Sequence, residues 1–102
     1  MNKQEFPKLS RKEFIILQML IENDEMFGLE MVEASEGNLK RGTIYVTLQR
    51  MGEKGLVESR EEPRPEGEIG IARRIYKTTG LGARVFKAQQ LALNYLNLGW
   101  EN

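Results

Sequence analysis

The sequence predicts an α+β fold that is mainly helical, and three observations lead to this prediction. Three helical patterns fill the first half of the chain, separated by short turns that contain glycine. Two short strand patterns follow, joined by a segment rich in proline, glycine and charge. A longer helical pattern ends the chain. This order is typical of a winged helix-turn-helix with an additional C-terminal helix.

The composition excludes several classes of protein. A chain of 102 residues forms one small compact unit. Without cysteine or histidine it lacks disulfides, a nucleophile-base pair and the usual zinc ligands, so we expect no enzyme, no metal and no other cofactor. Fifteen basic and fifteen acidic residues cancel, so positive charge must be local if the protein binds nucleic acid. The sequence has neither a bilayer-spanning apolar run nor a signal-peptide pattern, which predicts a cytoplasmic location without membrane contact.

The first helix is predicted over Ser10–Asn23. Ser10 and Glu13 have the spacing of a capping box, in which hydroxyl and carboxylate bind exposed amides at a helix start. Apolar residues between Phe14 and Ile21 occupy more than one face of this helix. That surface is wider than a small core needs, so we expect another chain to cover part of it.

Turns at 23–28 and 37–38 bound a short second helix, predicted from about Leu29 to near Gly37. In the third helix one apolar stripe has i, i+4, i+7 spacing and consists of Ile44, Leu48 and Met51. Another face carries Thr43, Thr47, Arg50 and Lys54. Gly55 supplies the positive φ that commonly ends a helix. The polar face either contacts DNA or is merely solvated, and its place as the second helix of a helix-turn-helix favours DNA.

Two strands are predicted after Gly55, over Leu56–Glu62 and Ile71–Lys77. The segment 63–70 between them is expected to be the tip of the hairpin, called the wing. Wings commonly lie along the phosphate backbone or in the minor groove. The side chains placed for such contacts are Arg64, Arg73 and Arg74. A loop that only improves solubility is the alternative.

Thr79 is the predicted N-cap of a last helix over Gly80–Gly99. Its polar residues form one narrow stripe, and apolar side chains occupy nearly all of the remaining surface. The preceding body is too small to cover it, so we predict a two-fold symmetric homodimer, with packing inside a monomer as the alternative. The chain would then comprise a DNA-binding part, 1–78, and a dimerisation helix, 79–102, within one compact unit.

Three motifs are more specific in combination than alone: Gly42-Thr43-Ile44-Tyr45, Glu53-Lys54-Gly55-Leu56 and Arg73-Arg74-Ile75-Tyr76. Together they resemble the signature of the PadR family of bacterial transcriptional regulators. The resemblance implies a dimeric repressor that binds a palindromic operator with its recognition helices in successive major grooves. The short C-terminus is similar to the family's smaller subgroup, in which a single final helix dimerises. The chain departs from the family's usual serine, proline and glutamate at Lys40, Val46 and Gly52.

The resemblance and the helical pattern together give the candidate DNA contacts. These are Lys40, Arg41, Thr43, Tyr45, Thr47, Arg50, Arg64, Arg73 and Arg74. We expect Arg41, Thr43 and Thr47 to approach base edges. The expected phosphate contacts are Lys40, Tyr45, Arg50, Arg73 and Arg74.

Apolar and aromatic side chains of the last helix are candidates for a dimer or effector pocket. They are Phe86, Leu93, Tyr95, Leu96 and Trp100. Such a pocket would accept a small aromatic or hydrophobic effector that releases DNA, and plain dimer packing is the alternative. A competing function is a winged-helix module that binds a protein partner and never meets DNA, which the zero net charge and the acidic flank of the wing would suit.

Overall fold

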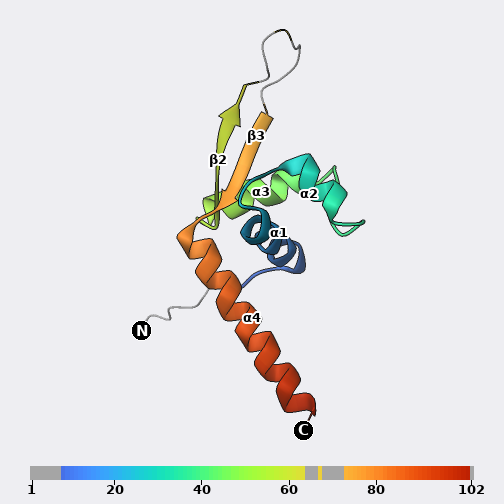
Figure 1. Ribbon diagram of the computed structural model, residues 1–102, viewed down its shortest axis with the longest axis vertical. Coiled ribbons are helices and arrows are strands. Elements are labelled where there is room, and N and C mark those ends of the chain that lie inside the picture. Colours follow the sequence, from blue (N-terminus) through green and yellow to red (C-terminus); the bar gives the residue numbers. More distant parts are fainter. Residues whose placement is uncertain (1–7, 64–66, 68–72, 102) are drawn as a thin grey trace.

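The computed structural model describes residues 8–63, 67 and 73–101 of the chain. In chain order, its elements are α1 (Arg11–Asn23), β1 (Met26–Phe27), α2 (Gly28–Ala34), α3 (Ile44–Glu53), β2 (Val57–Glu62), β3 (Arg73–Thr78) and α4 (Gly80–Glu101). Helices α1, α2 and α3 pack beside the base of the β2–β3 hairpin, and α4 extends from that base in the opposite direction (Figure 1). The predicted α+β fold, a mainly helical winged helix-turn-helix, is confirmed.

Helix α1 begins as its capping box predicts. The Ser10 hydroxyl accepts a hydrogen bond from the Glu13 N–H at 3.2 Å, and the Glu13 carboxylate accepts one from the Ser10 N–H at 2.9 Å. Ser10 is therefore the cap, and the helix itself starts at Arg11. The segment before α1 is tied to α4, because the Leu9 N–H donates to Gln89 Oε1 at 3.2 Å.

The turn expected at 23–28 contains a short strand that was not predicted from the sequence. Strand β1 pairs with β3 through Met26 opposite Tyr76 and Phe27 opposite Ile75. The antiparallel sheet therefore has three strands, in the order β1-β3-β2. Two residues are too few to show the alternation by which a strand is recognised in a sequence.

Helix α2 ends earlier than expected, at Ala34, because the side chain of the next residue, Ser35, forms hydrogen bonds with backbone groups on either side of it. The Ser35 hydroxyl donates to the Val32 carbonyl at 2.8 Å and accepts from the Leu39 N–H at 2.9 Å. These bonds turn the chain before Gly37, which has a φ of +94°.

Helix α3 starts at Ile44 and ends as predicted. Gly55 has a φ of +78°, the Leu56 N–H donates to the Met51 carbonyl at 2.9 Å, and the Gly55 N–H donates to the Gly52 carbonyl at 3.0 Å. This pair of bonds is a Schellman motif. It directs the chain straight into β2.

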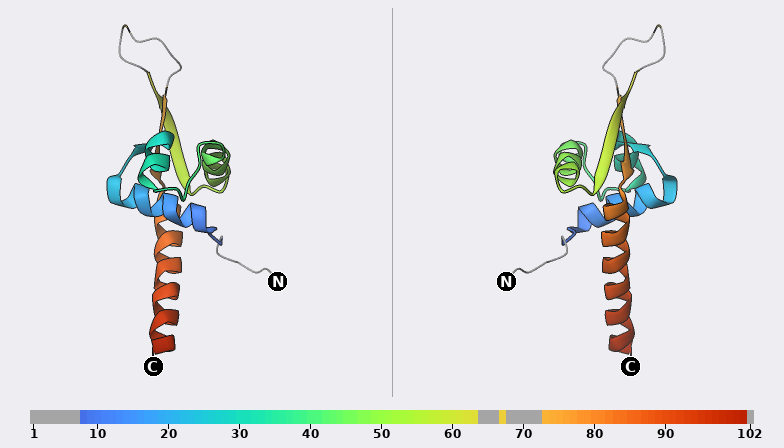
Figure 2. Two further views of the ribbon diagram at one scale, coloured as in Figure 1. Left: turned by 90° about the vertical axis from the view of Figure 1, so that its right-hand side faces the viewer. Right: turned by 90° about the vertical axis from the view of Figure 1, so that its left-hand side faces the viewer.

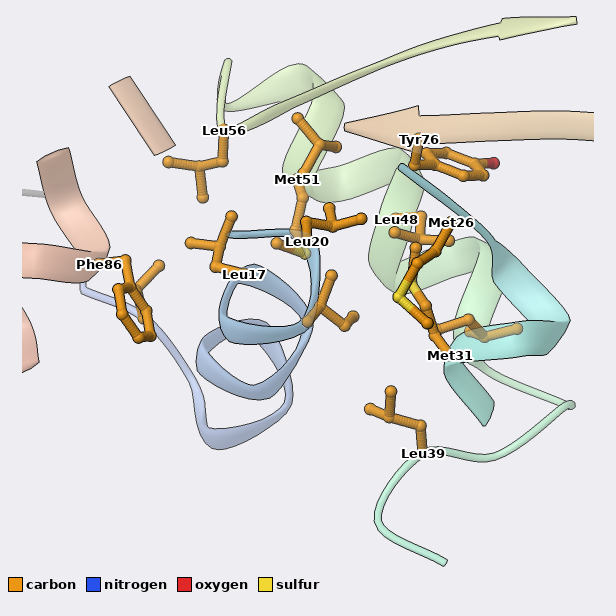
Figure 3. Packing of buried hydrophobic residues seen from close by; sticks show 14 of the residues in the cluster. Leu17, Leu20, Met26, Met31, Leu39, Leu48, Met51, Leu56, Tyr76 and Phe86 are labelled. Atoms are coloured by element: carbon orange, nitrogen blue, oxygen red, sulfur yellow. The ribbon is translucent and has the colours of Figure 1, made fainter. Parts of the chain in front are cut away.

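The core lies between the helices and the sheet. The predicted stripe of α3 is fully inside it, facing Ile16, Leu17 and Leu20 of α1. Figure 3 shows Leu48 and Met51 of α3 near Leu20, with Tyr76 on the sheet side. Phe86 of α4 stacks on Phe14 of α1, with ring centroids 4.6 Å apart, and this contact fixes the root of α4 on the body.

Helix α4 begins at the predicted cap, since the Gly82 N–H donates to the Thr79 hydroxyl at 3.0 Å. Its first turns pack on α1 and β3, but the later turns leave the body (Figures 1 and 2). Leu91, Leu93, Tyr95 and Leu96 are 46–77% exposed there. In the part of the chain that the structure describes, no helix has the length and apolar character needed to cross a membrane.

Candidate nucleic-acid interface

Helix α3 has a central outer surface and two flanks. Ile44, Leu48 and Met51 point into the core, so the residues on the far side of the helix face outward. Val46 lies near the middle of this outer surface and is 49% exposed. It is not among the contacts predicted from the sequence, although its position two residues from Ile44 and Leu48 places it opposite the apolar stripe.

One flank of α3 faces the N-terminal end of α1, which lies on the same side of the molecule as α3 (Figure 2). Between them is a hollow that we call the α1–α3 groove. It is lined by Lys8, Leu9, Ser10, Lys12 and Glu13 from the first segment and by Thr43, Val46, Thr47, Arg50 and Lys54 from the second. The groove thus brings together three candidates predicted from the sequence: Thr43, Thr47 and Arg50.

The other flank of α3 faces the wing. The α3–wing groove is lined by Tyr45, Leu48, Gln49, Gly52 and Glu53 of α3 and by Val57, Glu58, Ser59, Arg74 and Tyr76 of the sheet. Tyr45 therefore lies apart from Thr43, Thr47 and Arg50, with which it was grouped on the basis of sequence. Gln49 is exposed beside Tyr45 and is a further polar side chain of the kind that reads base edges, not selected from the sequence.

The position of Tyr45 depends on a glycine in the preceding helix. A Cβ on Gly28 would lie only 2.7 Å from Cε1 of the Tyr45 ring, so the ring packs directly on the backbone of α2. Tyr45 nevertheless remains 48% exposed. It is thus held in place on one side and open to a ligand on the other.

The candidates Lys40 and Arg41 lie in the turn that leads into α3. Both side chains are exposed, and the Lys40 carbonyl accepts the Thr43 N–H at 3.2 Å and the Ile44 N–H at 3.0 Å. Lys40 therefore starts the turn through its backbone, which leaves its side chain available at the helix start.

The two wing arginines lie on opposite faces of the sheet because they are adjacent in β3. Arg74 is on the α3 side, where it donates to Ser59 Oγ at 3.0 Å and lies 4.0 Å from a Glu61 carboxylate oxygen. Arg73 is on the other side, with its guanidinium 4.4 Å from the centre of the Phe27 ring. Arg64 lies outside the described residues.

Lys54 lies on the same face as Thr43, Thr47 and Arg50, as the helical pattern suggested, but it is engaged in an ion pair. Its Nζ donates to Glu13 Oε2 at 2.8 Å, and Glu13 is only 6% exposed. Burial alone would raise the pKa of Glu13, but the hydrogen bond and charge of Lys54, together with the Ser10 N–H and hydroxyl, lower that pKa below its ordinary value. Glu13 is thus ionised at neutral pH and ties the start of α1 to the end of α3.

The residues proposed for a dimer or effector pocket do not share one environment. Phe86 is 6% exposed and belongs to the chain's own core through Phe14, whereas Leu93, Tyr95 and Leu96 are exposed on α4. The side chain of Trp100 lies outside the described residues. Within those that are described, no group of three or more acidic side chains is arranged to hold a metal ion.

Comparison with known proteins places this architecture among transcriptional regulators. The model of the transcriptional regulator PadR-like family matches residues 16–88, which is more than half of the chain. No curated protein matches the sequence.

Solved structures of regulators have the same fold. A PadR family transcription regulator from Clostridium difficile has a TM-score of 0.71 and 24% identity, over 87% of this chain and 93% of the other. A Streptococcus transcriptional regulator has a TM-score of 0.64 and 27% identity, over 89% of this chain and 92% of the other. A mutant of MarR from Escherichia coli, solved as a complex with operator DNA, has a TM-score of 0.61 and 20% identity, over 78% of this chain and 52% of the other.

Proposed function

The chain belongs to the PadR-like family of transcriptional regulators, and from that membership we propose that it is a repressor that binds a palindromic operator as a homodimer. The observation that carries the proposal is the outer surface of α3, which is open along its length and has cationic side chains at its start and on one flank. An α-helix of this kind fits the major groove, where base edges are distinguishable.

The residues divide into base readers and phosphate contacts. Thr43, the N-cap of α3, and Thr47, on the α1 flank of that helix, are proposed to approach base edges together with Arg41. Thr47 Oγ1 donates to the Thr43 carbonyl at 3.1 Å, so its oxygen remains available as an acceptor. Lys40, Tyr45, Arg50, Arg73, Arg74 and Arg64 are proposed to hold phosphates.

The homodimer is proposed to form through the segment 79–102. The later turns of α4 expose four large apolar side chains that no other part of the described chain covers: Leu91, Leu93, Tyr95 and Leu96. Burial of such a surface against a second copy is favourable, and a two-fold symmetric pair would present two copies of α3, as a palindromic operator requires. The half-sites would then be about one helical turn, roughly 34 Å, apart.

The decisive experiment is selection of bound sequences from random duplex DNA at moderate salt. We expect enrichment of one palindromic site, and a chain that functions only as a protein-interaction module would enrich no sequence. On the selected duplex, Arg74→Ala is expected to lower the slope of log affinity against log salt by about 0.9 for each phosphate that the variant no longer neutralises. Lys77→Ala, in the same strand but outside the proposed contacts, is the matched control, and an equal effect of the two would contradict the assignment of Arg74 to DNA.

A small aromatic or hydrophobic effector is proposed to bind between the α4 helices and release DNA. The supporting observation is Tyr95, which is 77% exposed beside Leu96. Planar aromatic compounds should then quench the single tryptophan and weaken operator binding over the same concentration range. Operator affinity that stays constant across such a panel would leave dimer packing as the role of these side chains.

A further inference from the structure

The α1–α3 groove concentrates positive charge in a chain whose net charge is zero. Among the described residues that line it, four are cationic and Glu13 alone is acidic. The carboxylate of Glu13 is already used, because one oxygen accepts from Lys54 and the other from the Ser10 N–H. Among the described residues, Lys8, Lys12 and Arg50 form no ion pair. The groove therefore has three cations available to an anion.

The flank of α3 that faces the wing has the opposite balance. Among the described residues that line the α3–wing groove, Glu53 and Glu58 are acidic and Arg74 alone is cationic. Arg74 is itself near the carboxylate of Glu61. A polyanion that approaches α3 is thus attracted more strongly to the α1 side than to the described base of the wing.

The first turn of α1 also carries positive charge where the helix dipole disfavours it. Arg11 and Lys12 are the first two residues of the helix, where the N-terminal end of the helix dipole disfavours cations. Residues that oppose local stability in this way are expected at functional sites.

We propose that the α1–α3 groove holds the phosphate backbone of one DNA strand, with Lys8, Lys12 and Arg50 as the contacts. A helix in the major groove lies between two backbones, and the groove runs along the flank of α3 that carries Thr43 and Thr47. Glu13 acts as a positioning residue, because it fixes Lys54 and keeps the two walls of the groove together. The inference rests on the proposed function and adds to it a phosphate-binding surface outside the wing.

The test compares two double variants. The groove variant combines Lys8→Gln and Lys12→Gln, and the control variant combines Lys77→Gln and Lys87→Gln. Both double variants remove the same charge, but Lys77 and Lys87 lie outside the groove. Removal of a cation from the first turn of α1 does not weaken that helix, so the groove variant is expected to fold. Far-UV circular dichroism verifies the fold, and Arg50→Gln provides a second variant on the opposite wall.

Affinity for the selected duplex and for a scrambled one is measured over a series of salt concentrations. In the groove variant the salt slope should fall by about 0.9 for each phosphate that is no longer neutralised, about 1.8 per chain, with an unchanged ratio between the two duplexes. The control variant should keep most of the wild-type slope. If the wild-type protein binds DNA and the groove variant retains its slope, the groove is not a phosphate site. If the wild-type protein binds no duplex, the proposed function itself is refuted.

Discussion

Replacement of Gly82 by alanine tests how tightly α4 is attached to the winged helix. A Cβ at position 82 would lie 2.5 Å from Thr78 Oγ1 and 3.1 Å from the Leu56 carbonyl carbon, and closer still to the oxygen of that carbonyl. The carbonyl cannot move freely, because it accepts the Thr79 N–H at 3.1 Å and the Thr78 hydroxyl at 3.4 Å. The added methyl group must therefore displace the start of α4.

The expected loss of stability follows from two opposing effects. Overpacking of this kind costs about 1–3 kcal/mol. Alanine in place of glycine inside a helix recovers up to about 1 kcal/mol. We expect Gly82→Ala to lower the free energy of unfolding by about 1–2 kcal/mol, which lowers the melting temperature by about 4–8 °C per kcal/mol in a domain of this size.

The assay is urea denaturation followed by circular dichroism at one fixed protein concentration, because self-association would make stability depend on concentration. Gly80→Ala is the matched control in the same helix, since its Cβ would meet only Arg84 Nη1, at an ordinary 3.7 Å. The control should be as stable as the wild type or slightly more so. Equal stability of the two variants would show that the close approach of α4 to Leu56 does not constrain the fold.

Two further substitutions test the contacts around α3. Glu13→Gln keeps the capping geometry but removes the charge beside Lys54, and we expect a loss of about 1 kcal/mol because Lys54 is half exposed and can rehydrate. The pKa of Glu13 is lowered in the fold, so the wild type should be more stable than the variant by the full amount above the ordinary pKa of 4.5. This difference in the free energy of unfolding should vanish as the pH falls through the lowered pKa. A difference that persists in acid would contradict the assignment. Gly28→Ala should push the Tyr45 ring outward, leaving stability within about 1 kcal/mol while weakening DNA binding, and unchanged binding in a gel-shift titration would remove Tyr45 from the contacts.

The elements that the sequence predicted correctly are those with local signals. The capping box at Ser10, the apolar stripe of α3 and the positive φ of Gly55 each depend on residues a few positions apart. Such signals act before the chain is compact, so tertiary contacts did not override them. The order of the elements then followed from the turns between them.

The features that the sequence did not predict depend on contacts between distant segments. Strand β1 exists because Met26 and Phe27 meet β3 about fifty residues later, and so short a strand has no pattern of its own. Lys54 appeared to belong to a free polar face, but the partner that engages it, Glu13, lies 41 residues away. The division of α3 into a cationic flank and a mixed flank likewise depends on the distant segments that border the helix in the fold.

The connection between α4 and α3 leaves little freedom between the proposed dimer helix and the proposed DNA-reading helix. The Thr79 hydroxyl donates to the Gly55 carbonyl at 2.6 Å and accepts the Gly82 N–H at 3.0 Å, so one side chain joins the end of α3 to the start of α4. The Thr79 N–H also donates to the Leu56 carbonyl, against which Gly82 packs. Because packed contacts of this kind do not deform continuously, a rotation of α4 must either break them or carry the C-terminal end of α3 with it. A displacement of α4 by a bound effector would therefore be transmitted to α3 through Thr79, Leu56 and Gly82, and not through the wing.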